Sequence, residues 1–228
     1  MEFTFGIITS GDYDNLVNKI IDTIEFEEIP TYEVVVIGNS HVERKNTRVI
    51  PFNENIKPMW ITKKKNLITQ FAKYENIVFL HDYVYLMPGW YAGWLKYGND
   101  FKACMNVILN ADGSRFRDWV IWENPTENGE EIIKNAQHII PYYINNLSRY
   151  MYFSGAYWVA KKEIMQKYPL NEELVWNRGE DIDWSKKYRQ DNEFKMNPYS
   201  AVKCVKMKNP VFGILTDENV IQKLISLG

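Results

Sequence analysis

Runs of apolar residues alternate with amphipathic segments through the first hundred residues of the chain. The apolar runs are rich in β-branched and aromatic residues and end in small or polar ones, which predicts strands. Apolar positions three or four residues apart predict the helices between them. The strands are expected at 3–9, 32–40, 47–52 and 76–83, and the helices at 13–26 and 60–74. This repetition favours parallel strand pairing with helices on both faces of one sheet.

Beyond residue 100 the pattern loosens. Residues 101–109 are predicted to form a strand, and residues 150–168 a strand that leads into a helix. Residues 179–190 are predicted to form a helix with acids in its first turn and bases later, a charge order that the helix macrodipole favours. No repeat, low-complexity tract or linker is evident. We therefore predict one α/β domain over residues 1–228, with a mostly parallel central sheet flanked by helices.

Composition limits the classes of function. The 228 residues are 46% hydrophobic and 25% charged, which is typical of a globular protein. The formal net charge of -2 lacks the basic excess of nucleic-acid-binding proteins, so no nucleic-acid partner is expected. No run of about 18 apolar residues is present, and the start of the chain lacks a signal-peptide pattern. Two cysteines, Cys104 and Cys204, fit neither a disulfide scaffold nor a CxxC site. We expect a cytoplasmic protein without a transmembrane segment.

Polar or small residues follow three of the predicted strands, at residues 9–12, 39–40 and 81–83. In open α/β sheets, ligands bind beyond the carboxyl ends of the strands, so these positions are candidates to converge on a site. For any single strand end, turning the chain and capping the next helix is the stronger explanation. The glycine-rich phosphate loops GxGxxG and GxxxxGK[ST] are absent, which weakens dinucleotide and P-loop interpretations.

Four segments together resemble the nucleotide-sugar-dependent glycosyltransferases of the GT-A fold, especially the family 2-like group. FGIITSGDYDNL is similar to the opening strand and turn that hold the nucleotide, and YEVVVIGNS to the second strand with its small polar end. KKNLITQFAKYENIVFLHDY resembles a helix opened by a basic residue and Asn, followed by an apolar strand that leads into the DxD motif. FSGAYWVAKKEIM and RGEDIDWSKKYRQ resemble the sugar-pocket strand and the acidic segment that presents the catalytic base.

The resemblance implies a GT-A-like domain whose residues 1–100 bind the nucleotide and whose residues 101–228 bind the sugar and the acceptor. Matched position by position, it implies donor contacts from Thr9, Ser10, Asp12, Asn39, Ser40, Lys65, Asn66, His81, Asp82, Tyr83 and Gly155.

The chain departs from the family where a metal would bind. A DxD motif holds a divalent cation through carboxylate oxygens, because hard cations prefer oxygen ligands. The aligned triplet here is His81-Asp82-Tyr83, so neither end position is an aspartate. Two alternatives follow. Either Mn²⁺ or Mg²⁺ binds at Asp82, or the enzyme is metal-independent and its diphosphate is neutralised by Lys64, Lys65 or Arg178.

The acidic segment implies the chemistry. Asp181 is expected to be the catalytic base, with Glu180 beside it, and Asp183 and Trp184 are expected to contact the acceptor. The alternative is that these acids only stabilise the start of a helix.

We therefore expect a glycosyltransferase that moves a sugar from a nucleotide-diphosphate sugar to a hydroxyl acceptor such as a glycan, with inversion through Asp181. Retention stays open, because the fold hosts both outcomes. A catalytically decayed glycan-binding or assembly protein is the alternative from another class. A nucleotidyltransferase ranks last, because its glycine-rich basic N-terminal loop is missing.

Overall fold

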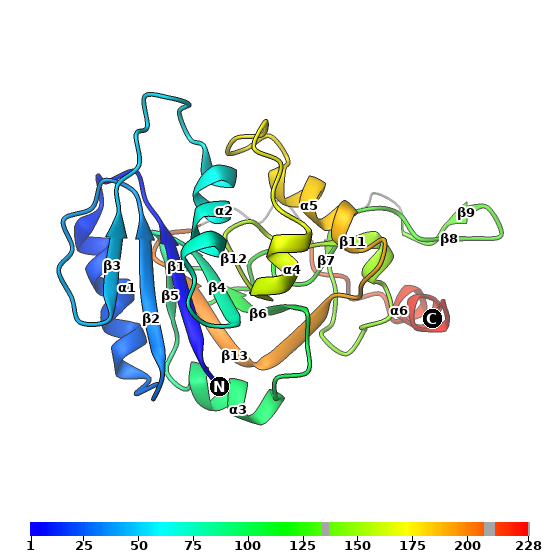
Figure 1. Cartoon of the computed structure of the whole chain (residues 1–228). Coiled ribbons are helices and arrows are strands. Elements are labelled where there is room, and N and C mark those ends of the chain that lie inside the picture. The colour runs from blue at the N-terminus through cyan, green and yellow to red at the C-terminus, as the bar shows by residue number, and fades with distance from the viewer. Residues whose placement is uncertain (134–136, 208–212, 228) are drawn as a thin grey trace.

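The computed structural model describes residues 1–133, 137–207 and 213–227. Its centre is an eight-stranded sheet with the strand order β3-β2-β1-β4-β12-β6-β13-β5 (Figure 1). The strands are β1 (Phe3–Ile8), β2 (Tyr32–Ile37), β3 (Thr47–Ile50), β4 (Asn76–His81), β5 (Val84–Leu86), β6 (Ala103–Leu109), β12 (Tyr157–Lys161) and β13 (Lys195–Cys204).

The sheet confirms the predicted α/β class and adds antiparallel strands to it. β3, β2, β1 and β4 pair in parallel, as the alternation of the first hundred residues predicts. β12 is antiparallel to both of its neighbours, β4 and β6, whereas β13 runs parallel to β6. β5 closes the far edge antiparallel to β13. The strands of the two halves of the chain are therefore interleaved within one sheet.

Helices cover the sheet and its ends. They are α1 (Asp14–Phe26), α2 (Ile61–Phe71), α3 (Trp90–Tyr97), α4 (Lys162–Lys167), α5 (Glu180–Tyr188) and α6 (Glu218–Ser226). α2 contacts β1 and β2 and packs beside α4, whereas α1 lies behind the strands in the view of Figure 1. The approach of α2 to β1 is so close that a Cβ atom at Gly6 would lie 2.2 Å from Cγ2 of Ile68. Glycine at position 6 therefore sets how deeply α2 sits on the sheet.

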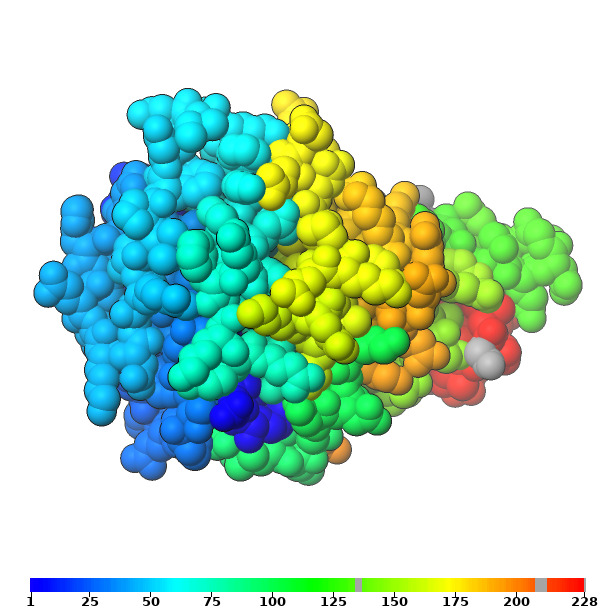
Figure 2. All heavy atoms as spheres, viewed as in Figure 1, coloured from blue at the N-terminus to red at the C-terminus, as the bar shows by residue number. Residues whose placement is uncertain are grey.

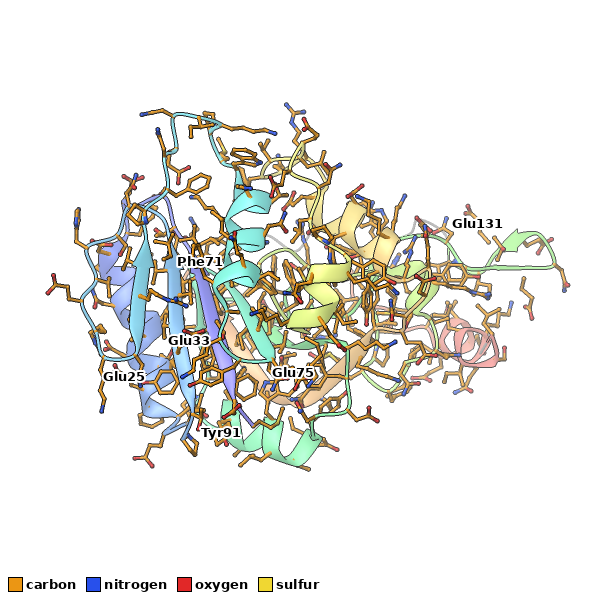
Figure 3. All side chains as sticks on the ribbon, in the orientation of Figure 1. Glu25, Glu33, Phe71, Glu75, Tyr91 and Glu131 are labelled. Carbon is orange, nitrogen blue, oxygen red and sulfur yellow. The ribbon has the colours of Figure 1, made fainter. Side chains whose placement is uncertain are left out.

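The loosely patterned second half builds smaller elements at one end of the molecule. A three-stranded sheet contains β7 (Val120–Ile121), β10 (His138–Ile139) and β11 (Met151–Tyr152), and a short 3-10 helix precedes β11 at Ser148–Tyr150. β8 (Thr126–Glu127) and β9 (Glu130–Glu131) form a hairpin that projects from the body, with Glu131 on it (Figure 3). Its two turn residues, Asn128 and Gly129, have φ values of 52° and 83°, the left-handed conformation that such turns require.

Several predicted elements differ in extent from those observed. The strand expected within residues 150–168 is two strands in two sheets, because β11 joins the three-stranded sheet and the chain enters the central sheet only at Tyr157. The sequence patterns also missed β5, α3, β13 and α6. None of the helices formed by the described residues has both the length and the apolar character needed to span a bilayer.

Aromatic residues fill the core below the carboxyl end of β4. Trp158 stacks on Trp184 with ring centroids 5.7 Å apart, and Trp184 stacks on Tyr188 at 5.0 Å. All three side chains are buried. This stack supports the region where β12 and α5 meet.

Candidate active site

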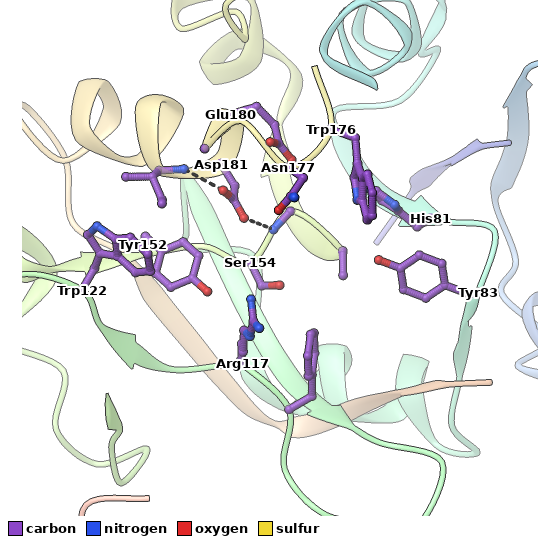
Figure 4. Close-up of a pocket in the computed structure, with 15 residues that line it drawn as sticks. His81, Tyr83, Arg117, Trp122, Tyr152, Ser154, Trp176, Asn177, Glu180 and Asp181 are labelled. Carbon is purple, nitrogen blue, oxygen red and sulfur yellow. Dashed lines mark hydrogen bonds between the residues drawn. The ribbon is translucent and has the colours of Figure 1, made fainter. Parts of the chain in front are cut away.

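A pocket of about 470 Å³ opens where β4 ends, where the chain crosses from β11 to β12, and where α5 begins (Figure 4). The lining residues are His81, Tyr83, Phe116, Arg117, Trp122, Tyr152, Ser154, Gly155, Ala156, Trp176, Asn177, Gly179, Glu180, Asp181 and Ile182. The structure thus brings the end of the fourth strand and the acidic segment, about a hundred residues apart in sequence, to one pocket.

Gly155 joins three of the predicted site residues. Its N–H donates to Oδ2 of Asp181 at 2.9 Å, and its carbonyl accepts a hydrogen bond from Nζ of Lys65 at 2.7 Å. A Cβ atom at this position would lie 3.2 Å from Oδ2 of Asp181 and 3.2 Å from Oε1 of Glu180. A glycine here therefore lets both carboxylates lie against the main chain of the pocket wall.

Burial sets the protonation behaviour of this group. It raises the pKa of Asp181, while the Gly155 N–H and the charge of Lys65 oppose the rise. Burial also raises the pKa of Glu180, and the neighbouring charge of Asp181 adds to it. The pKa of Lys65 falls to about 8 because its ammonium group is buried, although Glu180 and Asp181 favour the charged form. The result is two carboxylates of raised pKa above one buried cation.

The start of α5 presents the acids to the pocket. Gly179 precedes the helix in the left-handed conformation, with φ of 73°, and α5 begins at Glu180. Oδ1 of Asp181 accepts a hydrogen bond from the N–H of Ile182 in the first turn, and Oδ2 faces Gly155. Asp181 therefore contacts the first turn of its helix and also lines the pocket. Its geometry is compatible with stabilising the start of the helix and with a role in the pocket.

The three polar residues at the end of β4 point in two directions. His81 and Tyr83 line the pocket, with their rings 5.3 Å apart. Asp82 does not line it. Burial raises the pKa of Asp82, and a hydrogen bond with the side chain of Thr9 and the charge of Lys64 oppose the rise. The carboxylate of Asp82 thus faces the first strand end.

The other residues predicted at strand ends lie along the same edge of the sheet but outside the pocket: Thr9, Ser10, Asp12, Asn39 and Ser40. Ser10 Oγ donates to Asp12 at 3.1 Å, and Ser40 Oγ donates to Asp14 at 2.6 Å. The two loops touch, since a Cβ atom at Gly38 would lie 2.3 Å from the carbonyl oxygen of Thr9. They form a second polar surface beside the pocket.

Asn66 holds a neighbouring loop. Its amide donates to the carbonyl of Leu170 and to Oε1 of Glu172, both at 3.0 Å. Nε1 of Trp60 donates to the carbonyl of Glu172 at 2.6 Å, so the loop before α2 is tied to the same segment. Figure 2 shows these two loops side by side at the top of the molecule. Asn66 therefore supports the segment that carries Trp176 to the pocket.

The two residues predicted to contact the acceptor lie outside the pocket lining. Trp184 is 1% exposed, and its Nε1 donates to the carbonyl of Tyr168 at 2.7 Å. Asp183 is paired with Lys187 at 2.8 Å on the outward side of α5. The aromatic side chain that is exposed at the pocket is Trp176, with 47% of its surface accessible.

Sequence reasoning did not find Arg117, Trp122 and Tyr152, which line the pocket from the irregular segment after β6 and from β11. The rings of Trp122 and Tyr152 meet edge to face at 5.0 Å. The sequence offered one signal for Trp176, its position just before the matched acidic segment, and none for Arg117.

The GT-A family implies a divalent cation, and the residues present do not fit one. Within the described ranges, no three His, Cys, Asp or Glu side chains are grouped so that they could hold a metal ion. At the triplet that matches DxD, the single carboxylate faces Thr9 and Lys64 and not the pocket.

Comparison with solved structures shows that the fold is that of the GT-A glycosyltransferases. The structure of GalNAc-T7 with UDP, GalNAc and Mn²⁺ superposes with a TM-score of 0.62 at 13% identity, over 92% of this chain and 44% of that one.

Structures of TarS from S. aureus are similar too. TarS 1-349 in complex with UDP-GlcNAc gives a TM-score of 0.58 at 14% identity, over 100% of this chain and 66% of that one. TarS 1-349 alone gives 0.58 at 15% identity, and the chain spans 60% of its length. No protein-family model and no curated protein matches the chain. The similarity is one of fold.

Proposed function

We propose that this protein is a glycosyltransferase that moves a sugar from a nucleotide-diphosphate sugar to a hydroxyl of an acceptor such as a glycan. The observation that carries this proposal is the position of Asp181, a carboxylate of raised pKa in a pocket at the carboxyl end of β4. The fold adds support, because similar structures contain UDP or UDP-GlcNAc. Residues 1–100 would hold the nucleotide, and residues 101–228 the sugar and the acceptor.

Asp181 would act as the general base. Each carboxylate oxygen accepts one backbone hydrogen bond and keeps a lone pair for the acceptor hydroxyl. The acceptor oxygen attacks the anomeric carbon, its proton passes to Asp181, and the bond to the diphosphate breaks with its electrons on the departing oxygen. A raised pKa makes the deprotonated carboxylate a stronger base than an exposed aspartate. Direct displacement of this kind inverts the anomeric centre.

The neighbours of Asp181 would tune this step. Glu180 is 5% exposed and lies close enough to interact with Lys65 and Asp181. The charge of Lys65 opposes the rise in the pKa of both acids and so favours their ionised forms. Trp176, at the pocket edge, offers an apolar face on which a sugar ring can stack. We also propose a cytoplasmic location, which the two buried free cysteines support.

The altered triplet His81-Asp82-Tyr83 favours a second candidate, a glycan-binding or assembly protein on a catalytically decayed fold. The two candidates differ in the ligands that they bind. A decayed fold should bind no nucleoside diphosphate, whereas a transferase should bind its donor.

The experiment combines a binding screen with one variant. Thermal-shift and calorimetric titrations against UDP-, GDP- and dTDP-sugars should identify one nucleotide class, and product analysis should then detect transfer or slow donor hydrolysis. Asp181→Asn should lower turnover by about 10²- to 10⁴-fold while nucleotide binding is retained, because only proton removal is lost. Asp22→Asn is the matched control, because Asp22 is an exposed carboxylate on α1 that pairs with Arg44 far from the pocket.

The pH dependence supplies an independent check. Asp181 must be deprotonated to act, and its pKa lies above the ordinary value of 3.8, so kcat/KM should rise with pH through a midpoint above 3.8. Turnover of Asp181→Asn at the wild-type rate would reject the base, and absence of nucleotide binding would favour the decayed protein.

A further inference from the structure

The leaving diphosphate needs positive charge, and the usual source is not built into this pocket. The end of β4 directs Asp82 toward Thr9 and Lys64, and His81 and Tyr83 reach the pocket in its place. An imidazole and a phenol whose pKa is raised by burial are a poor ligand set for Mg²⁺ or Mn²⁺, which prefer carboxylate oxygens. The positive charge that offsets the diphosphate must then come from basic side chains.

The three basic residues expected from the sequence to replace a metal do not reach the pocket. Nζ of Lys64 donates to the carbonyl of Thr9 at 2.7 Å and also pairs with Glu54. Lys65 is buried below Gly155, and Arg178 is exposed outside the pocket lining.

Arg117 does reach it. Among the pocket-lining residues of the described chain it is the single Lys or Arg. Figure 4 shows its guanidinium group pointing toward Ser154 and Asp181 from the wall opposite α5. Phe116, buried at 6% exposure, anchors the backbone next to it, and a hydrogen bond joins Arg117 to Tyr152. A guanidinium held in this way offers a planar set of donors that matches two phosphate oxygens.

A second cation lies at the end of β4. Nζ of Lys206 is 5.9 Å from the ring centroid of Tyr83, and its charge acts on Asp82. Val205, just before it, donates its N–H to the carbonyl of Tyr83 at 2.8 Å, which fixes the backbone at this point. Lys206 is itself exposed. The two cations thus approach the region beside His81 and Tyr83 from different elements.

We propose that Arg117, assisted by Lys206, supplies the positive charge that offsets the leaving diphosphate, so that donor binding and transfer need no divalent cation. This inference rests on the proposed transferase function. In the transfer step the bond from the anomeric carbon to the diphosphate breaks, the electron pair stays on the diphosphate oxygen, and the guanidinium and ammonium groups stabilise the charge that develops there.

The test measures nucleoside diphosphate binding with and without a cation. UDP, GDP and dTDP are titrated by calorimetry into the full chain in EDTA and again in Mn²⁺. We expect the nucleotide that binds to have dissociation constants within about twofold of each other in the two buffers. Arg117→Gln should weaken binding by at least about tenfold, since removing one partner of a charged hydrogen-bonded pair costs more than 1.4 kcal/mol. Lys206→Gln should weaken it by about threefold, as an exposed cation contributes less.

Two further variants separate a binding role from a structural one. Arg117→Lys keeps the charge and loses the planar donor set, so it should fall between wild type and Arg117→Gln. Arg149→Gln, an exposed arginine stacked on Tyr150 and outside the pocket, should bind as wild type does. Circular dichroism and thermal unfolding show whether each variant is folded.

Each result decides a different question. Binding in Mn²⁺ alone, or unchanged binding by folded Arg117→Gln, would overturn the inference and leave the proposed transferase intact. A shift of the acidic limb of the pH profile without loss of affinity would also overturn it, because Arg117 would then only balance Glu180 and Asp181. Absence of binding by all three nucleotides in both buffers would reject the transferase proposal, and this inference with it.

Discussion

The pocket floor and the pocket rim are built on different principles. The pocket floor consists of Gly155, which lines the pocket, and of Lys65, Trp158 and Trp184, which lie beneath the lining; all four are buried and packed on one another. The pocket rim consists of Arg117, Trp122, Trp176 and Asn177, which keep part of their surface accessible beside the carboxylates. The difference teaches that the floor sets the shape of the pocket and the pKa values of its acids, while the rim presents accessible side chains to a ligand. Changes in the floor should therefore act on stability and protonation, and changes in the rim on binding.

The largest expected effect is the difference in stability between variants of two tryptophans, one in the pocket floor and one in the pocket rim. Trp184→Ala should lower the free energy of unfolding by about 3–5 kcal/mol, because it opens a cavity inside a stack of buried rings. Trp176→Ala should change the free energy of unfolding by less than about 1 kcal/mol, because that side chain is 47% exposed. It should raise KM for the sugar substrate, because the stacking face is lost. Urea unfolding and steady-state kinetics measure both quantities. Equal losses of stability in the two variants would break the distinction between floor and rim.

The second prediction concerns the buried cation of the floor. The pKa of Lys65 is about 8 in the folded protein and 10.5 ordinarily, so between these values the unfolded chain binds more protons and stability rises with pH. The gap corresponds to roughly 3 kcal/mol. Lys65→Met removes this dependence. The stability of wild type relative to Lys65→Met should therefore increase by roughly that amount from about pH 7.5 to pH 10.5. A constant difference would show that Lys65 is not desolvated.

A smaller effect is expected at the glycine of the floor. Gly155→Ala places a methyl group 3.2 Å from an oxygen of each carboxylate, so Glu180 and Asp181 must move by a few tenths of an ångström. Such crowding typically costs about 1–3 kcal/mol, and turnover should fall by roughly 10- to 100-fold with nucleotide affinity retained. Gly213→Ala, where the nearest atom is 4.0 Å away, is the control. Full activity in Gly155→Ala would mean that the acid pair does not need this contact.

The smallest effect is expected on the outward side of α5. Asp183→Asn breaks an ion pair with Lys187 one helical turn away, which contributes about 0.3–0.5 kcal/mol to stability. Because Asp183 does not line the pocket, KM for the acceptor should stay within about twofold of wild type. A large rise in KM would extend the pocket rim to this face and restore the contact that the family resemblance implies.

The sequence predicted the elements from β1 to β4 well because these strands and helices have clean periods. β1, β2 and β4 are buried apolar runs, and α1 buries one face. β13 was missed, since Pro198 interrupts its pattern and the pairing with β6 shifts register between Asn197 and Ala201. Such a bulge accommodates a proline that an unbroken strand would not. The hairpin at Asn128-Gly129 was also missed, although this dipeptide is a strong turn signal.

The candidate site was predicted in part for a similar reason. His81, Tyr83, Glu180 and Asp181 lie at the end of a strand and the start of a helix, positions that sequence patterns locate well. Residue type alone does not distinguish an exposed tryptophan from a buried one, so the sequence favoured Trp184, which is buried, over Trp176, which is exposed at the pocket. Arg117 could not be predicted from the sequence, because the segment around it has no regular period from which the direction of its side chain could be inferred.

The strand order has a consequence for how the molecule assembles. β12 is inserted between β4 and β6, and β5 from the first half forms the edge beyond β13. A chain cut after residue 100 would leave β4 with one bare apolar edge and β5 with no strand to join. Neither fragment should fold by itself, and mixing the two should restore a native spectrum slowly, because the contacts that complete the sheet are distant in sequence. During synthesis, the carboxylates of Glu180 and Asp181 would reach the end of β4 only after β12 and α5 have been made.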